Sequence, residues 1–457
     1  MPLTQPRLES LVRELRAAAQ VPGAAVGCLL GGESLVACDG ITSAEHPLPV
    51  DETTLFQIAS LTKPFTATAL LRLASEGKLD LEAQVRRVLP EFRLPRPEWT
   101  DRVRVVDLLT HRNGWAGDRF FIRPPRDRSL AGLVAEFSDN EQLAEPGTVW
   151  SYDNAAFSVA GRVIEVATGE AYPDALRRLV LAPLGMDHTF FRADEVVTHR
   201  VAAPHVVGKR PHVLRGAGWQ PGWELQPFDA PAGGLVSCVR DLLRWARFQL
   251  GDGRAPDGSA LLPRELLLRM QTETHAAGCS DDAVGLAWLM RDLGGERFFG
   301  HTGQTVGYLS EILLRRERGF ALVALTNALA DGGLRAALRG RVLEEAFGLA
   351  VRAPRPMATP PAPAQYEGTW RGPFELWTVR AGDAPGELAL EPRGHPPRSG
   401  SWTPPPPPPS RWAFYAPDRM VALAPEAMRG ARAEFVRDGA GRIAWLRCGG
   451  RIGPRAV

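Results

Sequence analysis

The segment QIASLTKPFTATALL, residues 57–71, places a lysine three residues after a serine. Only three of the 54 basic residues are lysines, and arginine holds nearly every other basic position. Arginine stays protonated in proteins, whereas a buried lysine can lose its proton and act as a base. Ser60 and Lys63 therefore have the residue types of a nucleophile and of the group that activates it.

The local sequence predicts a helix that carries both side chains. Pro64 is compatible with a helix only near its first turn, so we expect the helix to run from about Ser60 to Ser75. Residues three apart share one face of a helix, which brings Lys63 to the Ser60 hydroxyl. The positive end of the helix dipole favours an oxyanion beside the serine, and desolvation favours the neutral amine of the lysine.

The same spacing recurs at Ser75 and Lys78, so the spacing by itself is weak evidence. Gly77 is typical of a helix C-terminus, and we therefore interpret Lys78 as a solvated surface residue. A catalytic role for Ser60 needs support from other motifs.

Two further motifs supply that support. Tyr152-Asp153-Asn154 precedes a predicted helix, and His301-Thr302-Gly303 lies on a predicted strand. The order Ser-x-x-Lys, Tyr-x-Asn, His-Thr-Gly resembles the serine β-lactamase and DD-peptidase superfamily. It is most similar to the class C β-lactamase-like esterases and peptidases, whose third motif can begin with His. Neighbouring segments fit the resemblance, which covers roughly residues 10–350: LLTHRNGW (108–115), PLGMDHT (183–189) and PAGGLVSCVRDLLRW (231–245).

The resemblance implies a role for each catalytic side chain. Ser60 would attack an acyl carbonyl and become acylated. Lys63 and Tyr152 would form the proton relay, and which of them is the formal base stays open. Asn154 would orient Lys63 and the acyl group. His301 would line the opposite wall and either carry a proton or hold a substrate carboxyl.

It also implies where the acyl group would bind. The backbone N–H groups of Ser60 and Gln304 would form the oxyanion hole. Thr302 and Gly303 would let a substrate backbone lie along the strand. Three further residues are candidate substrate contacts: Trp223, Arg447 and Arg451.

One segment and one histidine can be interpreted as structural rather than functional. The Gly-, Pro- and Trp-rich segment 201–230, which holds Trp223, is either a flap over the site or a connecting loop. His111 is interpreted as a structural residue of a turn.

The pattern of elements predicts an α+β fold in two domains. An early hairpin at residues 24–40 and late strands at 306–328 flank a helical middle, which indicates one antiparallel sheet closed by both ends of a domain spanning residues 1–350. A proline-rich linker follows at 351–364. Seven short β-like pieces at 365–457 predict a small antiparallel barrel. The resemblance implies that this barrel is lipocalin-like.

Composition narrows the class of protein. The chain has 457 residues, more than one hydrophobic core usually organises, and a net charge of only +2, which does not suggest a nucleic-acid surface. The five cysteines and nine histidines show no spacing typical of a metal site, and no nucleotide motif occurs, so we expect no metal and no cofactor. The N-terminal residues predict an amphipathic helix rather than a secretion signal. We therefore expect a cytoplasmic protein that does not bind membranes.

Two groups within the superfamily fit a linker followed by one barrel. Penicillin-binding-protein-type thioesterases release nonribosomal peptides from a carrier protein by head-to-tail cyclisation, and the ending FVRDGAGRIAWLRCGGRIGPR favours this group. The partner would then be a peptide bound to a carrier protein or activated as a thioester. The alternative is a stand-alone esterase or D-aminopeptidase. A catalytically silent sensor is disfavoured by the intact motifs. In the cyclase interpretation, the barrel should influence the fate of the acyl-enzyme rather than its formation.

Overall fold

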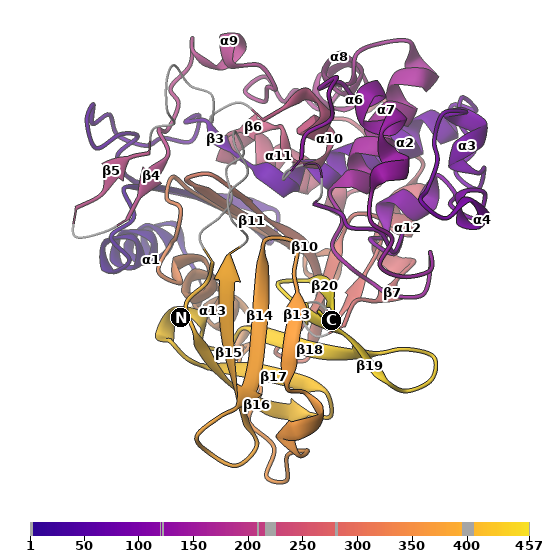
Figure 1. Cartoon of the computed structure of the whole chain (residues 1–457). Coiled ribbons are helices and arrows are strands. Elements are labelled where there is room, and N and C mark those ends of the chain that lie inside the picture. Colours follow the sequence, from indigo (N-terminus) through magenta and orange to yellow (C-terminus); the bar gives the residue numbers. More distant parts are fainter. Residues whose placement is uncertain are drawn as a thin grey trace. The chain divides into compact units, whose positions relative to one another are not determined.

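The computed structural model describes residues 3–118, 120, 123–207, 210–214, 225–278, 282–394 and 406–456 (Figure 1). Two compact units make up the chain. The first unit comprises Met1–Ala83, Phe157–Thr274 and Gly285–Val351, and the second comprises Gln84–Ala156, His275–Val284 and Arg352–Val457. Each unit is therefore assembled from segments that lie far apart in the sequence.

The first unit combines an antiparallel sheet with helices. Six strands follow one another in the order β2-β1-β12-β11-β10-β9, all antiparallel. The strands of the first unit, including short ones outside this sheet, are β1 (Gly23–Leu30), β2 (Glu33–Gly40), β3 (Phe56–Gln57), β4 (His205–Val206), β5 (His212–Val213), β6 (Val236–Ser237), β9 (Leu289–Leu293), β10 (Glu296–Thr305), β11 (Tyr308–Arg315) and β12 (Phe320–Thr326). Its helices are α1 (Gln5–Ala18), η1 (Ala59–Leu61), α2 (Thr62–Ser75), α8 (Tyr172–Leu176), η4 (Arg177–Leu181), α9 (Ala193–Val196), η5 (Pro227–Asp229), α10 (Ala230–Gly233), α11 (Val239–Leu250), α12 (Arg264–Thr272), η6 (Arg316–Arg318) and α13 (Leu334–Phe347).

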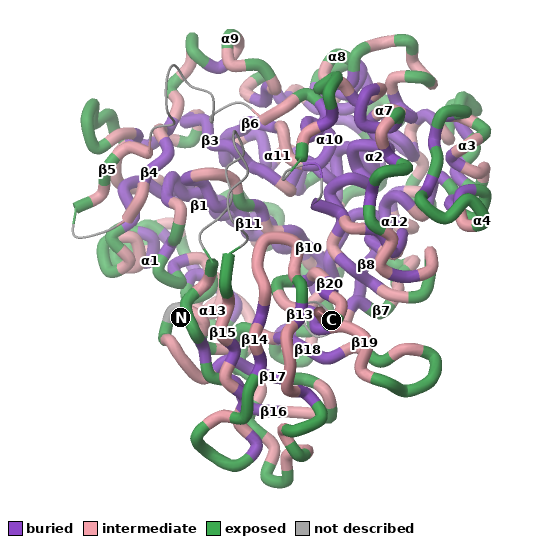
Figure 2. Tube along the Cα trace, in the orientation of Figure 1, coloured by how far each residue is buried: buried purple, intermediate pink, exposed green. Residues whose placement is uncertain are grey.

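Helices cover both faces of this sheet. Leu11 of α1 and Val342 of α13 share a hydrophobic core with Cys28 of β1. On the opposite face, a Cβ added at Gly27 would lie 2.9 Å from a methyl carbon of Leu243 in α11. Because successive strand residues point to opposite faces, the central strands are buried along nearly their whole length (Figure 2).

The predicted hairpin at residues 24–40 is present as β1 and β2. Gly31 and Gly32 join the two strands with φ of +59° and +89°. Positive φ at both central residues is what a two-residue turn between twisted strands requires, and glycine adopts it without strain.

The second unit contains the barrel. Eight strands run antiparallel in the order β13 to β20, and a bridge between Trp370 and Arg455 links the two ends, so the barrel is nearly closed. Its strands are β13 (Gly368–Arg371), β14 (Glu375–Ala381), β15 (Glu387–Gly394), β16 (Ser410–Ala416), β17 (Arg419–Ala424), β18 (Arg432–Arg437), β19 (Ile443–Cys448) and β20 (Arg451–Pro454). The α+β fold followed by a small antiparallel barrel is thus confirmed.

Short elements complete the second unit: α3 (Val85–Val88), α4 (Pro97–Thr100), η2 (Val106–Leu109), α6 (Leu130–Ala135), η3 (Phe137–Asp139), β7 (His275–Ala276), β8 (Ala283–Val284), η7 (Pro363–Gln365) and η8 (Glu426–Met428). Helix α7 (Ala155–Thr168) begins at the end of a second-unit segment and continues into the first unit.

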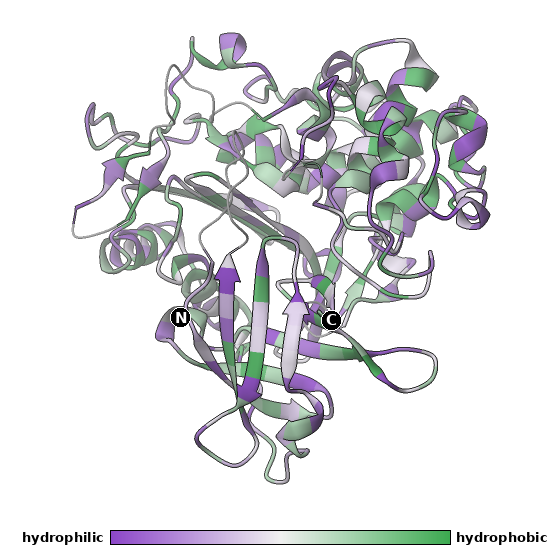
Figure 3. Ribbon diagram, viewed as in Figure 1, coloured by the Kyte–Doolittle hydropathy of each residue, from purple (hydrophilic) through white to green (hydrophobic). Residues whose placement is uncertain are grey.

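A core of aromatic and aliphatic side chains fills the barrel, with Trp370, Trp377, Trp412, Phe414 and Phe435 among its members. Trp377 and Val379 of β14 are buried and lie two residues apart, as expected for a strand with one buried face, and Figure 3 shows pale and green stretches along this strand. The sequence predicted only seven of the eight strands. It did not separate β20, because its four residues RIGP include Gly and Pro and show no alternation.

Among the described residues, no helix combines the length and the apolar composition needed to cross a bilayer.

Candidate active site

Ser60 lies in a tight turn at the start of the predicted helix. The turn is η1, and α2 continues directly from it. Ala59, the residue before the serine, has φ of +51°, a backbone conformation that residues with a Cβ seldom adopt. Such strain persists only where the surrounding structure enforces it, and it is common next to reacting groups.

Lys63 lies against Ser60 within hydrogen-bonding distance. Its Nζ is 3.0 Å from the Ser60 Oγ and donates to the carbonyl oxygen of Ala232 at 2.7 Å. The side chain is fully buried, and Nζ also lies 5.4 Å from the ring centre of Phe157. Burial favours the neutral amine, which is the form that can accept the serine proton.

Threonines of α2 hold the backbone that Lys63 contacts. Thr66 Oγ1 donates to the carbonyl oxygen of Pro231 at 2.7 Å, one residue before Ala232. Thr62 Oγ1 donates to the Ala59 carbonyl oxygen at 2.7 Å and accepts from the Leu235 N–H at 3.1 Å. The nucleophile turn and α10 are therefore both fastened to the first turns of α2.

Strand β10, which carries His301, Thr302, Gly303 and Gln304, lies close to the nucleophile turn. A Cβ at Gly303 would come within 2.3 Å of the Ile58 carbonyl oxygen and 3.0 Å of the Ala59 Cβ. The Gly303 position therefore requires glycine if the strand is to approach the turn this closely. The approach brings the backbones of Ser60 and Gln304 into one region, and their oxyanion role stays a prediction.

His301 is buried and neutral near pH 7. It is 3% exposed, and its Nδ1 lies 2.6 Å from the carbonyl oxygen of Thr302. Burial, followed by the charge of a protonated Lys63, lowers the pKa of His301 from 6.5 to about 3. A neutral ring can offer a substrate carboxyl a hydrogen bond but not a positive charge.

The Tyr152-Asp153-Asn154 motif lies in the second unit, where a turn at His111 supports it. The Asp153 N–H donates to His111 Nδ1 at 3.0 Å, and the His111 ring stacks on Tyr152 with ring centres 4.5 Å apart. His111 is thus a turn residue with φ of +56°, and it also positions the tyrosine. Its identity as a turn residue was predicted from the sequence, but its contact with Tyr152 was not.

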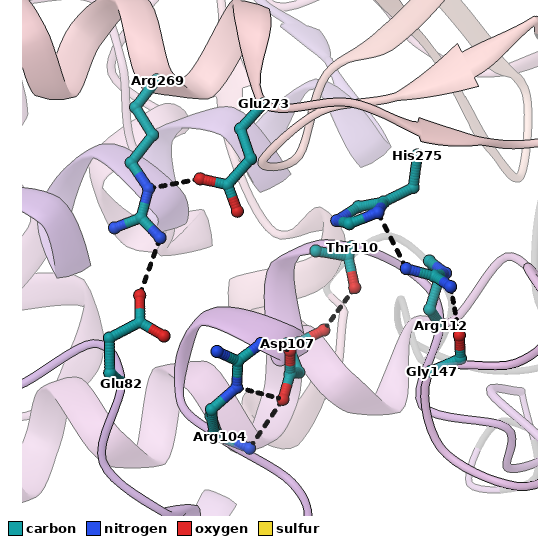
Figure 4. Close-up of polar contacts among 9 residues, drawn as sticks. All are labelled: Glu82, Arg104, Asp107, Thr110, Arg112, Gly147, Arg269, Glu273 and His275. Atoms are coloured by element: carbon teal, nitrogen blue, oxygen red, sulfur yellow. Dashed lines mark hydrogen bonds and ion pairs between the residues drawn. The ribbon is translucent and has the colours of Figure 1, made fainter.

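Polar contacts on both sides of His111 hold this turn (Figure 4). Thr110 Oγ1 donates to the carbonyl oxygen of Asp107 at 2.8 Å. Arg112 reaches His275 Nδ1 at 2.8 Å. Arg112 also donates to the Gly147 carbonyl oxygen, so the segment that supports Tyr152 is itself tied to β7 and to Gly147.

The barrel also contacts the motif. The Tyr152 N–H donates to the Gly450 carbonyl oxygen at 2.8 Å, in the turn between β19 and β20. The Arg451 guanidinium lies 4.8 Å from the Tyr152 ring centre and forms an ion pair with Asp118. Asp118 in turn accepts a 2.6 Å hydrogen bond from Asn154 Nδ2.

Asp153 is a buried carboxyl at the start of α7. Its Oδ1 accepts from the Ala156 N–H at 3.0 Å, as a helix N-cap does. Burial, followed by the nearby charge of Asp118, raises the pKa of Asp153 to about 7. No local sequence pattern indicates Asp118 or this pKa shift, since both depend on neighbours distant in the chain.

Three further residues were singled out in the sequence, and the structure describes two of them, Arg447 and Lys78. Arg447 is buried, forms an ion pair with Glu434 and donates to the Trp150 carbonyl oxygen at 2.7 Å. Its guanidinium therefore holds β19 in place, and a direct substrate contact stays a prediction. Trp223 lies outside the described residues. Lys78 is half exposed and pairs with Glu76 at 2.8 Å, as expected for a surface residue.

The candidate site residues thus fall into two sets. The first unit brings together Ser60, Lys63, His301, Thr302, Gly303 and Gln304. The second unit brings Tyr152 and Asn154 together with Arg451 of the barrel. Each set is described within its own unit, and the roles of its residues in catalysis stay predictions.

Comparisons with known proteins agree with these motifs. Residues 8–347 match the Beta-lactamase family. Penicillin-binding protein 4 of Amycolatopsis lactamdurans is 30% identical over 374 residues, which are 79% of this chain and 95% of that protein. The D-amino acid amidase of Ochrobactrum anthropi SV3, solved with L-phenylalanine amide, has a TM-score of 0.62 and 27% identity over 74% of this chain and 98% of its own.

One similar structure extends over both units. The crystal structure of SurE has a TM-score of 0.77 and 26% identity, and the match covers 99% of each chain. SurE has also been solved with D-Leu, and that structure matches with a TM-score of 0.74 over the same share of each chain. The family match and the shared length with penicillin-binding protein 4 lead to one conclusion: this chain belongs to the beta-lactamase family of serine hydrolases.

Proposed function

We propose that the chain is a peptidyl thioesterase and cyclase, which releases a nonribosomal peptide from its carrier by forming a macrolactam. The observation that carries the proposal is the likeness to SurE over 99% of both chains, which includes the barrel. The D-amino acid amidase matches only 74% of this chain. A relative that shares the whole architecture is a better guide to function than one that shares the catalytic domain alone.

The contacts in the first unit support formation of an acyl-enzyme. In its neutral form Lys63, whose Nζ lies 3.0 Å from the Ser60 Oγ, takes the hydroxyl proton as the oxygen attacks the thioester carbonyl. The C–S bond breaks, and the carrier thiol leaves with a proton. Ser60 then holds the peptide as an ester, and the carrier is free.

The second half-reaction decides the product. The amine at the other end of the peptide attacks the ester carbonyl, an amide bond forms, and the Ser60 Oγ regains its proton. Attack by water instead gives the linear acid. The first route needs the chain ends to meet, which costs entropy, so a cyclase must hold the peptide in a bent conformation.

The similar structures also support a substrate class. SurE has been solved with D-Leu, and the amidase is named for D-amino acids. A peptide whose acyl end is a D-residue is therefore the substrate we propose.

The proposal is tested with a short peptide thioester that ends in a D-residue. We expect the wild-type protein to give cyclic peptide as the main product by mass spectrometry, and Ser60→Ala to give neither cyclic nor linear product. Lys63→Arg is the matched control for charge. It should be nearly as inactive as Ser60→Ala, because arginine supplies no neutral amine at working pH.

Two outcomes would contradict the proposal. Ser60-dependent hydrolysis of small esters or D-amino acid amides, with only linear acid from every peptide thioester, would favour the esterase or D-aminopeptidase alternative. Product formation by Ser60→Ala would remove Ser60 as the nucleophile.

A further inference from the structure

Asp118 and Arg451 lie next to the Tyr-x-Asn motif but belong to none of the three catalytic motifs. We propose that Asp118, held by Arg451 of the barrel, is a positioning residue that fixes Asn154 and Tyr152 for acylation of Ser60. The inference rests on the proposed acyl-transfer function. It gives the barrel a part in forming the acyl-enzyme as well as in its later fate.

The Asp118 carboxylate connects Asn154 to the barrel. Asp118 Oδ1 accepts from Asn154 Nδ2 at 2.6 Å. The same carboxylate pairs with the Arg451 guanidinium, through Nε to Oδ2 and through Nη2 to Oδ1 at 3.3 Å. An arginine held in this two-pronged way has little freedom to rotate.

The contact with Asp118 determines the orientation of the Asn154 amide. A carboxylate only accepts hydrogen bonds, so the amide group that faces it must be the NH₂ donor. The amide oxygen then points away from Asp118 and is the atom that can accept a hydrogen bond from a catalytic group. Without the carboxylate, the Asn154 amide could rotate by about 180° and present its NH₂ donor in place of the oxygen.

Arg451 acts on Tyr152 through the same pair. Its guanidinium lies 4.8 Å from the Tyr152 ring centre and 6.0 Å from that of Phe374. A cation against an aromatic ring is attracted to the ring face, which restrains both groups. Arg451 is one quarter exposed and Asp118 only 2% exposed, so the pair is largely shielded from water and salt.

Hydrogen bonds from backbone groups next to Asp118 and Arg451 help to place these two residues. The Ala155 N–H donates to the Gly117 carbonyl oxygen at 2.9 Å, and a Cβ at Gly117 would lie 2.4 Å from the Asp153 Cα. From the barrel, the Ile452 N–H donates to Ser151 Oγ at 3.2 Å. Gly117 and Ile452, the chain neighbours of Asp118 and Arg451, are therefore each hydrogen-bonded to a residue that flanks the motif.

The test measures Ser60 acylation by p-nitrophenyl acetate in the full-length protein. Burst amplitude reports the fraction of active sites, and the burst rate constant reports acylation at each active site. We expect Asp118→Ala to lower the rate constant by roughly 100-fold, as misplaced catalytic groups do, while burst amplitude and half-saturating ester concentration change little. A purely structural role would lower the amplitude and leave the rate constant of the remaining sites unchanged.

Four further variants make the result specific. Arg451→Met should lose a similar factor, and the Asp118→Ala/Arg451→Met double variant should be no slower than the slower single variant, because the two residues act as one unit. Arg451→Ala should regain activity with added guanidinium ion, whereas Asp118→Ala should not. Arg411→Met, which removes an exposed barrel arginine paired with Glu387, should acylate like wild type.

The outcomes separate the two proposals. If the wild-type protein shows no burst that depends on Ser60, the proposed function fails. If the wild-type protein shows the burst but Asp118→Asn, which keeps the size of the side chain, and Arg451→Met both acylate at the wild-type rate, the positioning role is overturned.

Discussion

His301 and Lys63 are both buried in the first unit, and burial disfavours the charged form of each. For Lys63 this favours the amine that can take the serine proton. For His301 it means a neutral ring near pH 7, because its pKa is lowered to about 3. A neutral His301 therefore does not repel Lys63 at working pH.

The His301 shift predicts how the free energy of unfolding depends on pH. A base whose folded pKa is depressed contributes stability that is present above its unfolded pKa, 6.5, and is lost as the pH falls towards 3. Between pH 7 and pH 5 the wild-type protein should lose about 2 kcal/mol from this group, a loss that His301→Gln lacks. Urea unfolding of both proteins at the two pH values measures the difference. Parallel losses in the two proteins would show that His301 is not buried as a neutral ring.

At the scale of elements, the close approach of β10 to the nucleophile turn depends on Gly303. A Cβ there would lie 2.3 Å from the Ile58 carbonyl oxygen and 2.3 Å from Ser310 Oγ, and Ser310 Oγ already donates to that carbonyl at 2.7 Å. A side chain would have to push the strand away from the turn that carries Ser60.

Gly303→Ala should therefore destabilise the protein by about 1–3 kcal/mol, as overpacking does, and slow acylation of Ser60. The matched control is Gly340→Ala. Gly340 is an interior residue of α13, and a Cβ there would meet nothing within 4 Å. This control should gain roughly 0.5–1 kcal/mol and acylate normally, because alanine is the better helix former. Denaturant unfolding and burst kinetics measure both effects, and equal behaviour of the two variants would contradict the argument.

At the scale of the whole molecule, residues 352–457 do not form a compact unit by themselves. They form one compact unit with residues 84–156, which include Tyr152. The Tyr152 N–H donates to a barrel carbonyl, and Arg447 of β19 donates to the carbonyl oxygen of Trp150. These contacts argue against the expectation, drawn from the sequence, that the barrel affects only the fate of the acyl-enzyme.

Deletion of residues 352–457 should therefore abolish rapid labelling of Ser60 by a fluorophosphonate probe, even where the remaining chain stays soluble. The physical reason is that the Tyr-x-Asn segment loses the backbone acceptor at Gly450 and the Asp118–Arg451 pair. Labelling rate is measured by gel fluorescence, with circular dichroism to establish that the helices remain. A soluble, helical truncated protein labelled at the wild-type rate would restore the original expectation.

The sequence by itself determined the features that depend on nearby residues. Pro64 indicated where the Ser60 helix begins, paired glycines marked the β1–β2 hairpin, and short β-like pieces separated by turn residues predicted seven of the barrel strands. The Ser60–Lys63 contact was also predictable, because a spacing of three on a helix is a local property. The motif order indicated the family, since it needs only residue types and their order along the chain.

Tertiary structure decided the features that depend on residues distant in the chain. Asp118 and Arg451 are 333 residues apart, and neither lies in one of the three catalytic motifs. The neutral His301 and the raised pKa of Asp153 result from burial, which the packing of other segments creates. The assembly of residues 84–156 with the barrel likewise follows from contacts between separate segments. Local sequence patterns report local backbone preference, whereas desolvation and pairing across the fold exist only after the chain has packed.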